Sequence, residues 1–379
     1  MRIVILGGGF GGLNSALWLS DHLQESEHEI ILVADQPNFL FRPSLIWVPF
    51  GARKIEDISF SLETTLNKAG VQFILNKVVQ VLPKEKKVVL EDETAINYDF
   101  LVIATSGFPD YASIEGLKDN TASIYHAGDA LKTKEGVKTL KSGEPIVVGV
   151  AEGNPCPCNA YEFLFELDAH LKHHKIESPI TFFTYEEELF DLSANKASHR
   201  LEKHMQEKNI SFYCNVKLDK VDKENVYLSN GEILPYSFSL ILPRYKGADF
   251  IFLSNDIDHE NGLIHVNHHL QTIKWDNIYA VGDTILIKDM PMLKNGRGAE
   301  LQGHIAAKNI YSQLNGEPPK KEFQDSLLGL LELGTDGGMF MVKYPTSKLA
   351  SSFFEWAADG AIPHLMKIAY EKYYMWKLS

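Results

Sequence analysis

A glycine-rich turn between an apolar run and a stretch with helical periodicity constrains this chain more than any other feature. The run Arg2–Leu6 (RIVIL) has the composition of a buried parallel strand, and apolar residues recur with helical spacing in Leu13–Leu23. In the intervening GGGFGG, Gly7 permits a sharp turn, Gly9 lets the backbone approach a pyrophosphate, and Gly12 lets the helix pack on the strand. The pattern predicts a dinucleotide-binding α/β fold with phosphates at the helix N-terminus.

A second apolar run supports this interpretation. Glu29–Val33 follows the helical stretch and ends at Ala34-Asp35. A carboxylate at the end of the second strand of such a fold binds ribose hydroxyls, so we expect Asp35 to contact the ligand.

Two later segments resemble strands that two-domain flavoproteins share. Tyr98–Ser106 (YDFLVIATS) differs from the usual form only by Ser106 inserted before the glycine. Trp275–Thr284 (WDNIYAVGDT) resembles the segment that closes an FAD site, with Asp283 near the ribityl chain and the pyrophosphate. Three such segments in this order favour FAD over NAD at the first site. They resemble the pyridine-nucleotide-disulfide-reductase superfamily.

In that superfamily a second domain holds NAD(P)H on its own glycine-rich loop, and this chain departs from the pattern there. The strand Pro145–Val150 (PIVVGV) leads into AEGNPCPCNAYE, which keeps Gly153 but lacks the other two glycines. Pro155 and Pro157 stiffen the loop and remove amide donors. Because a pyrophosphate needs donated N–H groups, the loop is poorly suited to hold one.

The altered loop instead places two thiols directly before a predicted helix. The chain has 3 cysteines, which excludes a disulfide framework. Cys156 and Cys158 stand where a helix dipole favours a thiolate, and the alternative is that both are small packing residues. Cys214 lies in a predicted strand and is expected to be a core residue.

The chain as a whole resembles the sulfide:quinone oxidoreductases, whose relatives are the type II NADH dehydrogenases and the flavocytochrome c sulfide dehydrogenases. The segments that carry the resemblance are NFLFRPSLIWVPFG (Asn38–Gly51), KIEDISFSL (Lys54–Leu62), CPCNAYE (Cys156–Glu162), MLKNGRGAELQGHIAAKNI (Met292–Ile310) and KIAYEKYYMWKLS (Lys367–Ser379). The residues then expected to bind FAD are Gly7, Gly9, Gly12, Asp35, Pro43, Ser44, Ala104, Thr105, Gly282, Asp283 and Lys294.

The resemblance implies that two cysteines flank the flavin as a redox pair and carry sulfur. Cys156 falls on the middle one of three family cysteines, whereas Tyr125 and Gly329 stand at the other two positions. The redox partner of Cys156 is therefore missing. Cys158 is an additional thiol, although a Cys-x-Cys disulfide closes a small, strained ring. Sulfur transfer through one thiol to a small acceptor is the alternative.

Two further residues complete the catalytic candidates, which are Cys156, Cys158, Glu162 and Lys294. Glu162 has two interpretations that the sequence leaves open: a general base near the flavin, or a first-turn residue stabilised by the helix dipole. Lys294 resembles a family lysine beside the flavin, where a cation stabilises the reduced anion. Its alternative is a solvated loop lysine. No metal site is predicted.

The tail Ser351–Ser379 is dense in aromatic residues with lysines among them. This composition suits the headgroup region of a bilayer, but the segment is too short and too charged to span one. The alternative is a helix docked on its own body or on a dimer partner. If the resemblance holds, quinone enters here, and Phe340 and Met341 are candidate wall residues. The formal net charge of −13 argues against a nucleic-acid partner.

These observations predict two Rossmann-type three-layer α/β domains and a C-terminal membrane-facing segment. The expected FAD domain is discontinuous (1–113 and 242–317), the second, NAD-like domain is 114–241, and the quinone segment is 318–379. The expected function is transfer of electrons from sulfide or another reduced sulfur compound through Cys156 and FAD to quinone, peripherally on the cytoplasmic side of a membrane. A homo-oligomer is compatible with the sequence. The alternatives are an NADH:quinone oxidoreductase and a non-catalytic flavin-binding protein.

Overall fold

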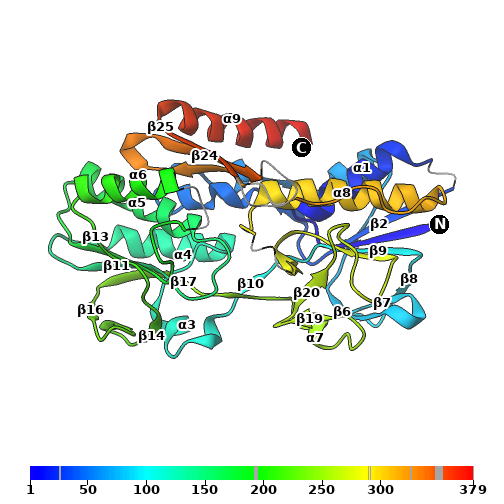
Figure 1. The fold of residues 1–379 in the computed structure, drawn as a ribbon, viewed down its shortest axis with the longest axis horizontal. Helices are drawn as coiled ribbons and strands as arrows, with labels where there is room; N and C mark the ends of the chain where they lie inside the picture. Colours follow the sequence, from blue (N-terminus) through cyan, green and yellow to red (C-terminus); the bar gives the residue numbers. More distant parts are fainter. Residues whose placement is uncertain are drawn as a thin grey trace.

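Two parallel β-sheets, each covered by helices, form the body of the protein in the computed structural model (Figure 1). The structure describes residues 1–24, 27–191, 195–288, 290, 292–324, 327–345 and 353–378. The strands are short runs of apolar, mostly β-branched residues buried on both faces, as expected of parallel sheets covered on both sides. The predicted α/β class is therefore confirmed.

The first sheet has the order β21-β9-β1-β2-β5, with all neighbours parallel. Its strands are β1 (Arg2–Leu6), β2 (Glu29–Ala34), β5 (Gln72–Leu75), β9 (Phe100–Ile103) and β21 (Ile278–Ala280). Helices α1 (Phe10–His22) and α8 (Gly296–Leu314) pack against each other, and α2 (Leu62–Lys68) contacts β5. Smaller elements around this sheet are β3 (Asn38–Leu40), the 3₁₀ helix η1 (Arg42–Trp47), β4 (Ser59–Ser61), β6 (Val78–Leu82), β7 (Lys87–Leu90), β8 (Ala95–Asn97), α7 (Asp249–Phe252), β19 (His259–Glu260), β20 (Leu263–Val266) and β22 (Ile285–Ile287).

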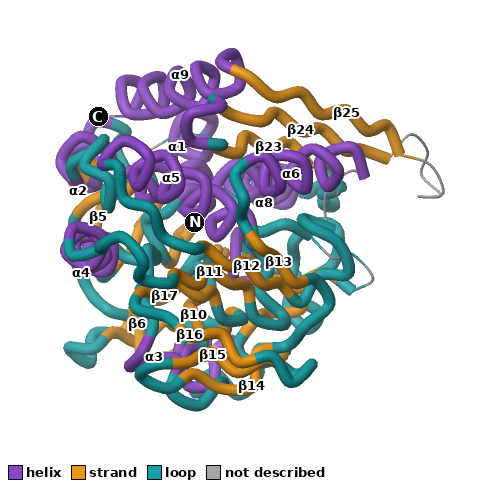
Figure 2. Tube along the Cα trace, turned by 90° about the vertical axis from the view of Figure 1, so that its left-hand side faces the viewer, coloured by secondary structure: helices purple, strands orange, loops and turns teal. Residues whose placement is uncertain are grey.

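The second sheet has the order β13-β12-β11-β17 and is also parallel. Its strands are β11 (Ile146–Val150), β12 (Ile180–Thr184), β13 (Ser211–Tyr213) and β17 (Phe238–Leu242), and its helices are α3 (Leu117–Asn120), α4 (Ala127–Lys138), α5 (Cys158–His174) and α6 (Asn195–Glu207). An antiparallel sheet of β14 (Leu218–Val221), β15 (Asn225–Leu228) and β16 (Ile233–Pro235) packs against one face of the second sheet (Figure 2). The domain boundaries given above stay a prediction. Leu242, the predicted first residue of the second FAD-domain segment, is the last residue of β17 in this second sheet.

Two short strands connect the two halves of the body. β10 (Phe108–Pro109) leaves the first sheet and pairs antiparallel with β18 (Tyr245–Lys246), which returns from the second. The crossing chains bring the end of β9 close to the segment that follows β17.

The C-terminal segment forms a three-stranded antiparallel sheet and a long helix above both halves (Figures 1 and 2). These elements are β23 (Leu327–Glu332), β24 (Gly338–Pro345), β25 (Phe353–Gly360) and α9 (Ala361–Leu378). Met339, Met341 and Ala357 of the sheet join the apolar core of the second half. Tyr374 and Leu378 of α9 join the core of the first half. The segment therefore holds the two halves together.

Candidate active site

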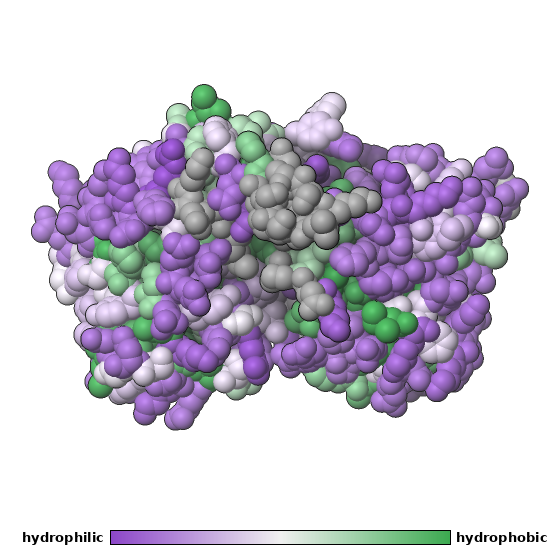
Figure 3. Space-filling view, viewed as in Figure 1, coloured by the Kyte–Doolittle hydropathy of each residue, from purple (hydrophilic) through white to green (hydrophobic). Residues whose placement is uncertain are grey.

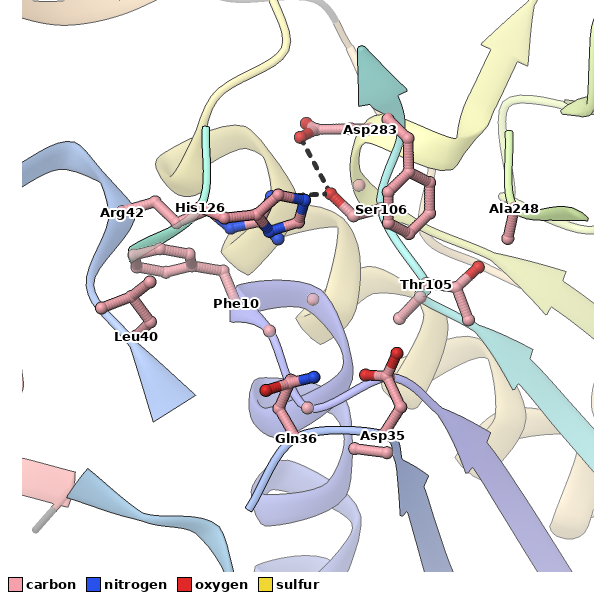
Figure 4. A pocket seen from close by; sticks show the side chains of 18 of the residues that line it. Phe10, Asp35, Gln36, Leu40, Arg42, Thr105, Ser106, His126, Ala248 and Asp283 are labelled. Atoms are coloured by element: carbon pink, nitrogen blue, oxygen red, sulfur yellow. Dashed lines mark hydrogen bonds between the residues drawn. The ribbon is translucent and has the colours of Figure 1, made fainter. Parts of the chain in front are cut away.

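A cavity of about 810 Å³ opens at the carboxyl edge of the first sheet (Figure 4). The glycine turn after β1, the ends of β2 and β9, the turn after β21 and the start of α8 form its walls. The predicted cofactor residues that line it are Gly7, Gly9, Asp35, Ala104, Thr105, Gly282 and Asp283. Residues far apart in the chain thus meet there because parallel strands end at a common edge.

The three glycines of the turn have the separate roles that the motif predicts. A side chain at Gly7 would meet the Ala104 backbone at 2.4 Å, and the φ of 103° there is left-handed. A side chain at Gly12 would lie 1.9 Å from the Gly7 oxygen, so this position sets the close packing of α1 on β1. Apart from Gly9 itself and its two neighbours in the chain, no atom of the described residues lies within 4 Å of the place that a Gly9 Cβ would take. It therefore presents bare backbone to the cavity.

Polar groups stand at both ends of the cavity. Asp35 lies beside Gln36 at one end, and Asp283 lies beside Ser106 at the other (Figure 4). The Thr105 hydroxyl between them is buried and has no hydrogen-bond partner within the described part of the chain. An unpartnered buried hydroxyl in a cavity wall indicates a group for a ligand.

A cluster around Arg42 occupies the Asp283 end, and sequence reasoning missed it. Arg42 Nη1 donates to the Tyr125 hydroxyl at 2.9 Å and to Ser106 Oγ at 3.2 Å. Ser106 Oγ in turn donates to Asp283 at 3.3 Å. Arg42 belongs to the FRPS stretch, so a charged residue there was an available signal. Among the other lining residues, Asn295 lies in the quoted segment Met292–Ile310, whereas His126 had no such signal.

The two thiols lie side by side at the start of α5, whose first residue is Cys158. The Sγ atoms of Cys156 and Cys158 are 2.7 Å apart, and both cysteines are free thiols. Cys156 is buried and Cys158 is half-buried. The hydrogen bond with Cys158 and then burial raise the pKa of the Cys156 thiol, and Asp283 raises it further. The sequence predicted a thiolate favoured by the helix dipole, but at Cys156 these neighbours favour the thiol.

Lys294 lies beside the same turn. Its backbone N–H donates to the Pro155 carbonyl at 3.0 Å, and its Nζ donates to the Ile285 carbonyl. Burial lowers the pKa of Lys294 to about 8, against an opposing effect of Asp283. Lys294 is thus not a solvated loop residue, although it is not among the cavity-lining residues.

Glu162 is directed toward the C-terminal segment. Its carboxylate accepts hydrogen bonds from Lys367 Nζ and, at 3.0 Å, from the Glu332 backbone. Burial raises the pKa of Glu162, and Lys367 lowers it. These contacts give Glu162 a role in holding α9, which neither of its two interpretations included.

Pro43, Ser44 and Gly12 are the remaining predicted cofactor residues outside the cavity lining. The Ser44 hydroxyl donates to Glu371 of α9 at 2.6 Å, so it is engaged away from the cavity. Pro43 is the second residue of η1 and directly follows the lining residue Arg42. Gly12 acts through packing, as described above.

The comparisons with known proteins agree with this geometry. The family model described as pyridine nucleotide-disulphide oxidoreductase matches residues 1–303. The sulfide-quinone reductase of Aquifex aeolicus is 30% identical over 399 residues, an alignment covering 100% of this chain and 91% of that protein. The mitochondrial sulfide:quinone oxidoreductase of Dictyostelium discoideum is 26% identical, over 84% of this chain and 72% of that protein. The crystal structure of the Aquifex aeolicus sulfide:quinone oxidoreductase superimposes with a TM-score of 0.91 at 28% identity, covering 100% of this chain and 91% of that one.

The fold, the glycine turn and the cavity define an oxidoreductase with a dinucleotide-type cofactor, and the chain belongs to the pyridine nucleotide-disulphide oxidoreductase family. Within that family it belongs with the sulfide:quinone oxidoreductases. It is therefore an FAD-dependent enzyme. The cavity fits FAD, because Gly9 gives the backbone access that a pyrophosphate needs, Asp35 directly follows β2 where a ribose lies, and the buried Thr105 hydroxyl has no partner among the described residues.

Proposed function

We propose that this enzyme passes two electrons from sulfide, or another small reduced sulfur compound, through its thiol turn and FAD to a quinone. The observation that carries the proposal is the position of the thiol turn beside the cavity. The Pro155 carbonyl, directly before Cys156, accepts from the Lys294 backbone N–H at 3.0 Å, and Lys294 directly precedes the lining residue Asn295. Bound FAD supplies a two-electron acceptor. The chain supplies the thiols, the buried Lys294 and the Arg42 cluster around that end of the cavity.

The second half of the protein gives NADH little to bind. In an NADH site, an acidic residue at the end of the second strand holds the ribose. Glu186 stands just after β12, but its carboxylate already accepts from Tyr161 at 2.9 Å, from Thr184 at 2.7 Å and from the Asp191 backbone at 3.1 Å. Phe190 packs edge-on against the Tyr161 ring. This arrangement favours the sulfur compound over NADH as the electron donor.

Anaerobic mixing tests the donor directly. Purified protein is mixed with sulfide and, separately, with NADH, while flavin absorbance is followed. We expect bleaching by sulfide only, and its loss in Cys156→Ser with flavin content unchanged. Cys214→Ser is the matched control, because Cys214 lies outside the thiol turn and should leave the rate unchanged. Bleaching by NADH alone would support the NADH:quinone alternative, and bleaching by neither would support a non-catalytic flavoprotein.

We also propose that the outer face of α9 and β25 binds a membrane surface, which brings the enzyme to its quinone. The apolar residues exposed there are Phe354, Trp356, Ile362, Leu365, Met366, Tyr373 and Trp376, with Trp376 77% exposed. Figure 3 shows hydrophobic atoms at the top of the molecule, where these elements lie. Within the described residues, no helix is both long enough and apolar enough to cross a bilayer. The cytoplasmic side stays a prediction.

Single apolar residues scattered over a surface are common, but so many on one face indicate an interaction site. Their composition fits the interfacial region of a bilayer. Its aromatic rings lie beside exposed Lys372 and Lys377, whose ammonium groups reach phosphates. Insertion stabilises the bound state by about 25 cal/mol per Å² of apolar surface removed from water. The net charge of −13 opposes binding to anionic lipid. Binding should therefore depend weakly on salt.

A surface variant tests membrane binding without disturbing the docked face of α9. Ile362→Ser, Leu365→Ser and Trp376→Ser together should abolish sedimentation with phosphatidylcholine vesicles and slow turnover with long-chain quinones. Reduction by the sulfur donor should be unchanged. Ile233→Ser, Leu253→Ser and Ile273→Ser form the control, since those exposed side chains lie elsewhere. Vesicle binding by the first variant equal to that of the control would reject this surface.

A further inference from the structure

The turn Asn154–Cys158 holds two thiols in contact. In the family arrangement, the redox partner of Cys156 would instead be a cysteine far away in the chain. Tyr125, at one of the other family positions, is bonded to Arg42. Gly329, at the other, pairs with Met341 in the C-terminal sheet. Neither position offers a sulfur atom. Cys158 is the one thiol that the described structure places against Cys156.

Hydrogen bonds fix the turn in the conformation that brings the thiols together. Asn154 Oδ1 accepts from the Cys156 backbone N–H at 2.8 Å, and Asn154 Nδ2 donates to the Pro243 carbonyl at 2.6 Å. The Tyr185 hydroxyl donates to the Asn154 carbonyl at 2.9 Å. Pro157, with φ near −64°, then leads into α5. The turn is thus tied to the second sheet and, through Pro155, to Lys294.

We propose that Cys156 and Cys158 form a local redox pair that replaces the distant pair of the family. This inference deepens the proposed function and rests on it. In the oxidised enzyme the two Sγ atoms are joined by a disulfide. Its formation breaks two S–H bonds and forms one S–S bond, and the two electrons go to the bound flavin while two protons leave.

Hydrosulfide then opens the disulfide. It attacks Cys156 Sγ, the Sγ–Sγ bond breaks, and the electron pair leaves on Cys158, which takes a proton. Cys158 begins α5, where the helix N-terminus stabilises a leaving thiolate. Cys156 now carries a persulfide. A second hydrosulfide accepts its outer sulfur as HSS⁻, and both thiols are restored.

The short ring suits this cycle better than it suits a structural crosslink. A disulfide across a single residue is strained, and strained disulfides have higher reduction potentials. Such a bond is opened readily by a small nucleophile. Cys156 holds the sulfur in a buried position near the cavity wall, and the half-buried Cys158 is the partner that leaves and returns.

Peptide mass spectrometry of the FAD-loaded protein tests the pair without relying on turnover. After anaerobic oxidation by a quinone and alkylation of free thiols, the peptide with both cysteines should be unalkylated and two hydrogens lighter. This peptide should be fully alkylated after reduction. Cys158→Ser should leave Cys156 alkylated after oxidation, and Cys214→Ser should behave as wild type. Full alkylation of the oxidised wild type would overturn the proposal.

Addition of sulfide to the same protein tests the local redox pair and the sulfur donor separately. Sulfide added to the oxidised protein should place one trapped persulfide on Cys156, and this should be lost in Cys158→Ser with flavin content retained. Persulfide in Cys158→Ser at the wild-type level would overturn the local pair while leaving the sulfur donor supported. A disulfide that forms but yields no persulfide with sulfide would support the pair and reject sulfide as the donor.

Discussion

Lys367 of α9 forms a buried ion pair with Glu162 of α5, joining residues 205 positions apart in the chain. Lys367 also lies 5.0 Å from the centre of the Trp47 ring. The Glu332 carboxylate belongs to the same group and bonds His364 at 2.6 Å. Burial raises the pKa of both Glu162 and Glu332, and Lys367 lowers it in both. This one lysine therefore compensates the buried carboxylate of Glu162 and, together with His364, that of Glu332.

Removal of this lysine should destabilise the whole protein. Lys367→Met removes the ion-pair partner of the buried Glu162, and breaking a buried pair from one side costs about 3–5 kcal/mol. Urea unfolding at neutral pH measures the loss. Protonation of Glu162 relieves it, so the loss should shrink as the pH falls below the raised pKa. Lys377→Met, at an exposed position, is the control and should change stability by less than about 0.5 kcal/mol. Equal effects of the two variants would contradict the role given to Lys367.

Glu186 should make stability decrease as pH rises. Burial raises its pKa from 4.5 to about 7. Between pH 4.5 and about pH 7, Glu186 is ionised in the unfolded chain but still protonated in the folded protein. Its contribution to the free energy of unfolding is therefore complete below pH 4.5 and is lost as the pH rises through about 7. The change is at most about 3 kcal/mol, at about 1.4 kcal/mol per pKa unit. Glu186→Gln should flatten this dependence in urea unfolding at about pH 5 and about pH 8. A pH dependence identical to that of the wild type would show that a group other than Glu186 causes it.

Gly9 and Gly12 should separate cofactor binding from folding. Gly9→Val projects a side chain into the open cavity, where no protein atom lies within 4 Å, and should yield folded protein without flavin. Gly12→Val places Cβ 1.9 Å from the Gly7 oxygen and should impair folding itself. Circular dichroism and the flavin absorbance per chain distinguish the two results. Normal flavin content in the first variant would show that the pyrophosphate does not pass Gly9.

Tyr125→Phe should have a small effect that is limited to the Arg42 cluster. The substitution removes the hydroxyl that accepts from Arg42 and donates to Gly107, but keeps the ring against Tyr245. We expect a loss of about 1–3 kcal/mol in unfolding free energy, since two hydrogen bonds of about 0.5–1.5 kcal/mol each are removed, with flavin content unchanged. Loss of flavin in this variant would show that the hydroxyl contacts the cofactor directly.

The sequence by itself determined the features that depend on local geometry. The Gly7, Gly9 and Gly12 spacing after an apolar strand meets the steric needs of a dinucleotide-binding turn, and Pro155 and Pro157 remove donors wherever the loop lies. The class of fold follows from such local requirements, whereas the family and FAD follow from the resemblance of several segments to known ones. The sequence also places Cys156 and Cys158 two residues apart. The contact between their Sγ atoms, however, depends on the turn conformation that the Asn154 hydrogen bonds impose.

Only the tertiary structure decided which distant groups meet. The sequence around Glu162 does not indicate that its partner is Lys367. An ion pair between α5 and α9 depends on how β23 and β25 position the last helix. Sequence could not separate the docked and outer faces of α9 either, since both contain aromatic residues. Tyr374 is buried against Phe39 and Phe41, whereas Trp376 is exposed. The helical period orients these side chains, but the surface that Tyr374 meets is built from α1 and β3, where Asn14, 360 positions away in the chain, donates to its hydroxyl and Phe39 stacks on its ring.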